Sequence, residues 1–271
     1  MEFLLLFVRY CFIMIPYVDY GGVWQVGELI AVLSGKGGTG KTSVCAGIAA
    51  ALAASGRRVL CIDCDVGLRN LDISLGLTDT PSLSFLEVCR GDYPLTQATV
   101  HPKYPSLSFL TAPMNCAIDS IDPLSFGALV FEARKVYDYI LLDAPAGVDA
   151  GFRLTATYAD RCIIVTGPGP AAVRDAERTG QLLELMGKTN VRLIVNRVDK
   201  KTVSAMDITI DDVMDSAGLP LLGVVPEDLN VTLAAAVGQP LLKYKPRTAA
   251  AKACRRIANR IQGRPEPMGL R

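Results

Sequence analysis

The sequence predicts one α/β domain built on a mostly parallel, twisted sheet that is flanked by helices. From residue 29 onward, short β-branched runs alternate with amphipathic stretches, which is typical of βαβ units. A phosphate-binding pattern, G-x-x-x-x-G-K-[ST], occupies residues 35–42 directly after the first of these runs. The 271 residues are 50% hydrophobic with a net charge of +1, which provides a large core but no bulk signal for a polyanionic partner.

The periodicity assigns the elements in chain order. Apolar, β-branched runs of strand length are expected to form strands at 29–33, 58–63, 107–110, 139–143, 161–166, 191–196 and 221–225. Longer stretches with apolar residues at helical spacing are expected to form helices at 41–54, 124–136, 171–186, 211–216 and 248–261. Two proline-containing stretches, 93–105 and 113–123, are expected to be loops over the sheet. Because no linker interrupts this order, residues 27–262 are predicted to be a single domain.

The two ends of the chain do not match the domain pattern. Residues 1–26 are strongly apolar, but Arg9 interrupts the run and Pro16 ends it, so it is shorter than the roughly 20 apolar residues of a membrane span. Glu2 and the absence of an A-x-A site argue against a signal peptide. We therefore expect an N-terminal extension, with a start codon assigned too early as the alternative. Residues 263–271 contain two prolines and little apolar surface, so no membrane-binding helix is expected there.

The eight cysteines include one pair at redox or zinc-site spacing, Cys61-x-x-Cys64. No second pair or histidine cluster completes a metal site, and the single histidine, His101, is remote in sequence. The pair lies at the end of the apolar run 59–62. We therefore expect both cysteines to be buried around a strand.

The loop between the first strand and the first helix predicts a nucleotide site. Its glycines allow the backbone N–H groups to surround phosphates, and the positive end of the following helix dipole faces the same charge. Lys41 is expected to reach the β- and γ-phosphates, and the hydroxyl of Thr42 to bind Mg²⁺. The predicted nucleotide-binding residues in this loop are Gly35, Lys36, Gly37, Gly38, Thr39, Gly40, Lys41, Thr42 and Ser43.

Carboxylates follow two other predicted strands, and ligands of open α/β sheets bind beyond such carboxyl ends. The apolar run 139–143 ends on Asp143, a Walker B arrangement that places a carboxylate near Mg²⁺ beside the loop threonine. Asp63 and Asp65 follow the second strand and are expected to orient the attacking water or to bind Mg²⁺ through water. Turn and cap chemistry remains the alternative role for these two carboxylates.

The segments GLRNLD at 67–72, DAPAG at 143–147, NRV at 196–198 and GVVPED at 223–228 accompany the loop GKGGTGKTS in colinear order. From about residue 29 to residue 261, the chain resembles the MinD family of septum-site-determining ATPases. This family belongs to the deviant Walker A group of P-loop NTPases, together with the ParA/Soj partition ATPases. The resemblance implies a cytoplasmic ATPase, peripheral on the inner face of the cell membrane, that uses ATP and Mg²⁺.

The resemblance also implies specific partners and residue roles. Two subunits would sandwich two ATP molecules, and each Lys36 would reach the partner's phosphates, with catalytic roles for Lys36, Lys41, Asp65 and Asp143. A division-inhibitor protein and an activator of hydrolysis are the implied protein partners. Asn196 would contact adenine, and the turn Pro226-Glu227-Asp228 would pack on the base. Asp175 would lie near Lys36, or would be an ordinary carboxylate in the first turn of a helix.

The sequence also departs from the family and leaves other functions open. Members of the family end in a basic amphipathic membrane helix, which residues 263–271 lack. The chain could instead be a ParA/Soj-like or flagellar-number-type positioning ATPase that acts on DNA or another partner. The polar side of the helix at 248–261 would attract anionic lipid in a MinD-type protein that reaches the membrane differently, would bind DNA in a ParA-like one, or would simply face solvent. It comprises Lys252, Arg255, Arg256, Asn259 and Arg260. An iron–sulfur reductase on the same loop would need Cys116 and Cys162 as cluster ligands.

Overall fold

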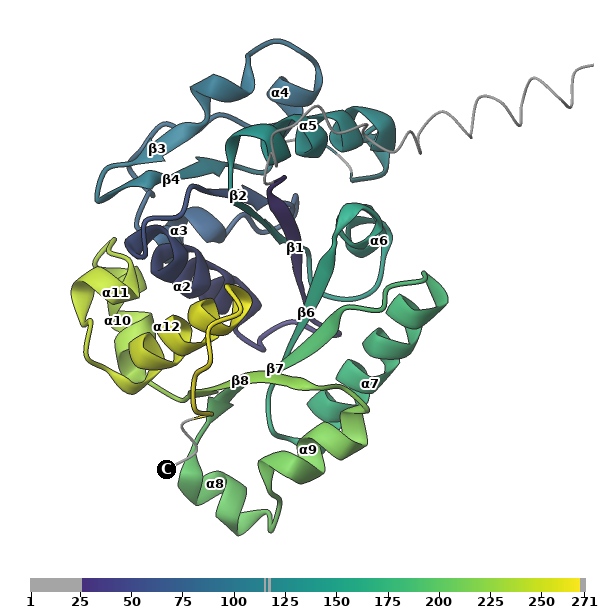
Figure 1. Ribbon diagram of the computed structural model, residues 1–271, viewed down its shortest axis with the longest axis vertical. Coiled ribbons are helices and arrows are strands. Elements are labelled where there is room, and N and C mark those ends of the chain that lie inside the picture. The colour runs from purple at the N-terminus through teal and green to yellow at the C-terminus, as the bar shows by residue number, and fades with distance from the viewer. Residues whose placement is uncertain (1–25, 115, 117, 269–271) are drawn as a thin grey trace, which may run out of the picture.

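A computed structural model describes residues 26–114, 116 and 118–268, which form an eight-stranded sheet with helices on both faces (Figure 1). The strand order is β3-β4-β2-β5-β1-β6-β7-β8, and every neighbouring pair is parallel except the antiparallel edge pair β3–β4. The predicted fold class is therefore confirmed. The N-terminal extension predicted at residues 1–26 lies outside the described residues, apart from Val26.

All seven predicted strands form, and the structure adds one. The strands are β1 (Glu28–Leu33), β2 (Val59–Asp63), β3 (Thr99–His101), β4 (Tyr104–Leu110), β5 (Tyr139–Asp143), β6 (Arg161–Thr166), β7 (Val191–Val198) and β8 (Leu221–Pro226). The prediction of a loop throughout residues 93–105 was wrong, because β3 lies inside it. A three-residue edge strand is too short to show the period-2 alternation that identifies strands in a sequence.

The five predicted helices form as α2 (Lys41–Ala54), α5 (Pro123–Val136), α7 (Pro170–Leu185), α9 (Ile210–Ala217) and α12 (Ala249–Ile261). Shorter helices were not predicted: α3 (Leu71–Leu75), α4 (Phe85–Cys89), α6 (Ala150–Tyr158), α8 (Lys200–Ala205), α10 (Leu229–Ala236) and α11 (Leu241–Tyr244). Two 3₁₀ turns, η1 (Leu95–Gln97) and η2 (Ile118–Ser120), lie in the predicted loops. These helices have four to nine residues, which offers few positions for a 3.6-residue period to be recognised.

The two faces of the sheet bury separate sets of side chains. Along β1, Ile30 and Val32 point into the layer formed by α2 and α12, whereas Ala31 and Leu33 point into the layer formed by α6, α7 and α9. A third cluster packs α5 against β2 and β5. Because the central parallel strands are covered on both faces, they are almost continuously apolar rather than alternating, as the predicted runs were.

The cysteine prediction is confirmed. Cys61 lies within β2 and Cys64 directly after it, and both side chains are fully buried. Among the described residues, no group of three or more His, Cys, Asp or Glu side chains could hold a metal ion. Cys162 is buried in the cluster formed with α6 and α7, whereas Cys116 packs against the separate cluster around α5 on the same face of the sheet. The two cysteines considered for an iron–sulfur cluster are thus not brought together.

Helix α12 packs as predicted on its apolar side, where Cys254, Ile257, Ala258 and Ile261 are buried. Its polar side is less open than the sequence indicated, since Lys252 alone is exposed while the other four side chains are half-buried. The guanidinium of Arg260 donates to the carbonyls of Leu222 at 2.7 Å and Pro267 at 2.6 Å. Arg260 therefore ties the described part of the tail to β8. In the described residues, no helix is both long and apolar enough to cross a bilayer.

His101 fixes the edge of the sheet to α3, and this gives a first prediction. The ring is buried: its Nε2–H donates to the carbonyl of Leu75 at 2.8 Å, and its Nδ1 accepts from the N–H of Lys103 at 3.0 Å. Burial lowers the pKa of His101. A neutral ring in the folded state stabilises it above the unfolded pKa of about 6.5, and this stabilisation is lost as the pH falls further.

We expect the free energy of unfolding of the wild-type chain, relative to His101→Gln, to decrease between pH 7 and pH 5.5. One titrating group limits the slope to about 1.4 kcal/mol per pH unit. Urea titrations of both proteins at each pH measure it. The difference between the two proteins matters, since carboxylates that are common to both titrate in the same range. A difference that is constant with pH would contradict the assigned role of the ring.

Candidate functional site

The strand register brings the predicted site residues to one edge of the sheet. Val32 of β1 pairs with Asp143 of β5, and Asp143 pairs in turn with Asp63 of β2. The phosphate-binding loop leaves β1 at this same edge and enters α2 at Lys41. Strand β1 lies between β5 and β6, where the chain order reverses, and this is the crevice in which open α/β sheets bind ligands.

Two glycines give the loop its curvature. Gly38 and Gly40 have φ angles of 82° and 80°, in the left-handed region that other residues adopt at a cost. A Cβ atom on Gly40 would also lie 2.3 Å from Nδ2 of Asn196. Asn196 is buried, and its Nδ2 donates to the carbonyl of Thr39 at 2.7 Å. The amide side chain on β7 therefore holds the last turn of the loop in place.

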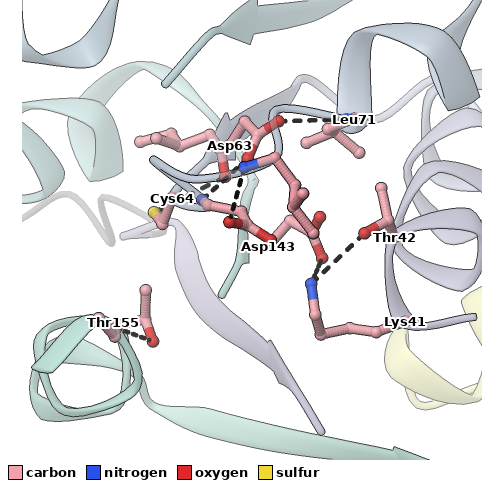
Figure 2. A network of polar contacts seen from close by, with 11 residues as sticks. Lys41, Thr42, Asp63, Cys64, Leu71, Asp143 and Thr155 are labelled. Carbon is pink, nitrogen blue, oxygen red and sulfur yellow. Dashed lines mark hydrogen bonds and ion pairs between the residues drawn. The ribbon is translucent and has the colours of Figure 1, made fainter. Parts of the chain in front are cut away.

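Lys41 and Asp143 form a buried ion pair at the centre of the site (Figure 2). The Lys41 Nζ lies 2.5 Å from Oδ1 of Asp143 and 3.4 Å from Oγ1 of Thr42. Burial raises the pKa of Asp143, while the Lys41 ammonium and the Thr42 hydroxyl act in the opposite direction. One cation, one carboxylate and one hydroxyl thus share a single water-poor location, in the arrangement that the sequence predicted for phosphate and metal chemistry.

Asp63 and Asp65 organise the loop that follows β2. Both carboxylate oxygens of the buried Asp63 accept backbone N–H groups, from Asp65 at 2.9 Å and from Leu71 at 3.1 Å (Figure 2). Burial, together with the nearby Asp143, raises the pKa of Asp63 to about 7. Asp65 accepts from the N–H groups of Gly67 and Leu68 at 3.2 Å. Their roles as water-orienting or metal-binding groups stay predictions, and the observed bonds are those of turn residues.

A cavity of about 160 Å³ adjoins the loop at the ends of β7 and β8. It is lined by all four residues predicted to contact the base, Asn196, Pro226, Glu227 and Asp228, together with Gly40 and Ser43. The carboxylate of Asp228 already accepts hydrogen bonds from the N–H groups of Asn230 at 3.0 Å and Ala250 at 3.3 Å. It therefore shapes the wall by capping α10.

Lys36, the lysine expected to act across a dimer, forms an ion pair within its own chain. Lys36 lies 3.7 Å from Asp175 on α7, and the two side chains are 43% and 31% exposed. Asp175 is in the second turn of α7 rather than the first, so the sequence-based alternative of an ordinary first-turn carboxylate was wrong in position. Gly35 permits this approach, since a Cβ there would lie 2.6 Å from the carbonyl oxygen of Asp175. An ion pair this exposed contributes at most about 1 kcal/mol, so Lys36 can leave it readily.

Sequence reasoning missed Arg197 and the cavity-lining face of α10. Arg197 has a φ of 58°, pairs with Glu227 at 2.9 Å, and donates to the carbonyl of Gly38 at 3.2 Å. Its place beside Asn196 in the NRV segment was the available signal. Val231 and Thr232 also line the cavity, but they lie in a short helix that the sequence did not reveal.

The residues present fit a magnesium nucleotide. Mg²⁺ prefers oxygen ligands, and the Thr42 hydroxyl and Asp143 carboxylate both lie within contact of the Lys41 ammonium. Thr39 lies inside the loop, and its buried Oγ1 has no hydrogen-bond partner among the described residues. A buried polar atom of this kind is normally satisfied, so its position in a phosphate-binding loop is consistent with a polar ligand there.

Comparisons with known proteins agree with this geometry. The CobQ/CobB/MinD/ParA nucleotide binding domain matches residues 30–241. The septum site-determining protein MinD of a Synechocystis species is 38% identical over 242 residues, which cover 89% of this chain and 91% of that protein.

Solved structures give the same result. A chain of the MinC:MinD cell division protein complex of Aquifex aeolicus superposes with a TM-score of 0.82 at 35% identity, covering 89% of this chain and 98% of that one. MinD of Pyrococcus horikoshii, complexed with Mg-ADP, superposes with a TM-score of 0.77 at 30% identity, covering 87% and 96%.

Proposed function

Because the chain belongs to the CobQ/CobB/MinD/ParA nucleotide-binding family, we propose that it is an ATPase that dimerises on ATP and helps to place the division septum. The observation that carries the proposal is the buried contact of Lys41 with Asp143 and Thr42 beside the phosphate-binding loop. The family relatives that are septum site-determining MinD proteins support the cellular role.

Each loop residue has a task in this proposal. Backbone N–H groups between Gly35 and Gly40 bind the phosphates, and Lys41 exchanges its bond to Asp143 for one to the β- and γ-phosphates. Thr42 and Asp143 would hold Mg²⁺, which neutralises charge that develops on the phosphoryl oxygens. Asp65 orients the attacking water, and Asp63 keeps the loop after β2 in register with the site. The cavity beside Asn196 receives the adenine.

The position of Lys36 supports the proposed dimer. Its ammonium is half-exposed and bound only by a surface ion pair, so a second subunit can offer it a stronger partner. When two such loops face each other across bound ATP, each Lys36 contacts the phosphates held by the other subunit. A cation supplied in trans stabilises the charge of phosphoryl transfer, as an arginine finger does.

The proposed partners extend the family role. The Aquifex aeolicus complex of MinC with MinD supports a division inhibitor as a protein partner for this chain. We also propose an activator of hydrolysis and a location at the inner face of the cell membrane. These partners would bind the ATP-bound dimer in preference to the monomer, because the dimer exists only while the γ-phosphate is bound.

Two measurements on the purified chain test the proposal. With ATP and Mg²⁺, light scattering should report the mass of a dimer and a phosphate assay should show turnover, whereas ADP should leave a monomer. Deleting the gene from its own cells should then displace septa, scored by microscopy. If the chain remains monomeric with ATP, the proposed ATP-dependent dimer is contradicted. If cells that lack the gene place their septa normally, the proposed cellular role is contradicted.

A further inference from the structure

The segment from Leu229 to Pro265 contains no Asp or Glu, and its surface combines exposed apolar side chains with cations. Its first part, residues 229–242, is uncharged and holds α10 and α11. Its second part carries the cations Lys243, Lys245, Arg247, Lys252, Arg255, Arg256, Arg260 and Arg264. Such a division between apolar and basic surface indicates a partner that offers both an apolar layer and negative charge.

The apolar part is a stripe on the outer side of α10. Leu229, Leu233 and Val237 are four residues apart, so they share one side of the helix, and they are 69%, 40% and 51% exposed. The other side of α10 faces the protein, because Val231 packs against the core cluster that includes α2, and Ala234 is buried. The helix therefore has a packed inner side, and its outer side presents three large apolar side chains to solvent. We call these three residues the α10 stripe.

The cations lie next to this stripe. Asp228, which caps α10, accepts the N–H of Ala250 at 3.3 Å, so α10 and α12 begin side by side. Helix α11 follows α10 directly, and the three helices lie together at the left of Figure 1. Lys243, Lys245 and Arg247 are exposed and, among the described residues, none of the three forms an ion pair with a carboxylate. We call these three residues the basic cluster.

We propose that the α10 stripe and the basic cluster form a binding surface for an anionic lipid bilayer. The apolar side chains enter the boundary between headgroups and acyl chains, while the cations remain among the lipid phosphates. The inference deepens the proposed location at the membrane and rests on it, but it assigns the contact to the ATPase domain itself.

Charge complementarity selects lipid over the other occupants. A second copy docked symmetrically on this face would bring like charges of the two basic clusters together, which is unfavourable. Duplex DNA would use the cations but would leave the α10 stripe in water, since its affinity comes from phosphate contacts. Of these three occupants, the anionic bilayer is the one that uses both halves of the surface.

The position of α10 also connects the surface to the nucleotide site. Val231 and Thr232 line the cavity proposed for adenine, on the same eight-residue helix that carries Leu229 and Leu233 of the stripe. We expect a nucleotide that fills the cavity to contact these two side chains, to hold α10 in place and so to favour insertion of the stripe. By thermodynamic reciprocity, anionic vesicles should then tighten nucleotide binding by the same factor.

Vesicle co-sedimentation of the full chain tests the proposal. Vesicles of phosphatidylcholine with phosphatidylglycerol should bind the wild-type chain, and phosphatidylcholine alone should bind it weakly. The double variant Leu229→Ser/Leu233→Ser should lower binding at least about tenfold, because it removes the inserted surface without altering charge. Lys245→Gln/Arg247→Gln should lower it about fivefold for each cation lost, and the remaining binding should depend less on salt.

Matched controls lie elsewhere on the surface. Leu185→Ser on α7 removes an 86% exposed leucine, and Lys200→Gln/Lys201→Gln on α8 removes two exposed cations, and neither should change vesicle binding. Circular dichroism and ATP-dependent dimerisation, measured on each variant, separate misfolding or failure of the proposed ATPase from loss of the lipid surface.

Two results would overturn the inference. One is vesicle binding that survives both double variants, which would place the lipid contact elsewhere in the chain. The other is a chain that ignores anionic vesicles but shifts duplex DNA with a steep salt dependence, with the serine variant as active as the wild type. That result would assign the cations to nucleic acid instead.

Discussion

Replacing Lys41 by methionine is expected both to abolish ATP hydrolysis and to destabilise the fold. Removing the cation that contacts the phosphates should lower turnover by roughly 10³-fold. The same change leaves Asp143 buried without its 2.5 Å partner. Breaking a buried pair by removing one member costs about 3 kcal/mol, and less where the remaining carboxyl takes up a proton. Phosphate release and urea denaturation measure the two effects.

The double variant Lys41→Met/Asp143→Asn separates these consequences. An asparagine in place of Asp143 removes the uncompensated charge while preserving shape, so most of the lost free energy of unfolding should return. ATP turnover should not return, because both the phosphate cation and the proposed metal carboxylate are missing. If the single Lys41→Met variant keeps wild-type stability, the ion pair between Lys41 and Asp143 does not contribute to the stability of the folded protein.

The order of the sheet elements could be predicted because central parallel strands leave an unmistakable pattern. Residues such as 29–33 and 139–143 are buried on both faces, so they appear as continuous apolar runs in the sequence. The strand β3 and the helices α10 and α11 could not be predicted. Their positions depend on tertiary contacts, such as those of His101 with Leu75 and of Asp228 with Ala250, rather than on local periodicity.

The residues that gather at the site were predicted for a similar reason, since carboxyl ends of parallel strands meet at one edge. The hydrogen-bond partners of each side chain could not be predicted from the sequence. Asn196 was predicted as a base contact, yet its amide also holds the loop through the carbonyl of Thr39. Arg260 was assigned to an open basic face, yet its guanidinium donates hydrogen bonds to the carbonyls of Leu222 and Pro267. Such pairings are set by packing between segments far apart in the chain.

Replacing Lys36 by alanine is expected to separate nucleotide binding from the ATP-driven switch. In the monomer, Lys36 contacts Asp175 rather than the buried pair of Lys41 and Asp143, so ATP should still bind with little change. The dimer should fail to form, because the cation that reaches the partner's phosphates is absent. Stimulated hydrolysis should fall by about 10³-fold or more, the range for loss of a cation supplied in trans. Calorimetry, light scattering and phosphate release measure the three quantities.

Two further variants make the interpretation specific. Lys201→Ala removes an exposed lysine on α8 and should leave dimerisation unchanged, so a general loss of surface charge is excluded. Asp175→Asn frees Lys36 from its surface ion pair and should strengthen ATP-dependent dimerisation by up to about fivefold, since such a pair contributes no more than about 1 kcal/mol. If Lys36→Ala dimerises normally with ATP, the lysine does not act across the interface. If Asp175→Asn dimerises less well than wild type, Asp175 belongs to the interface itself, and its pairing with Lys36 is not a contact that the partner subunit displaces.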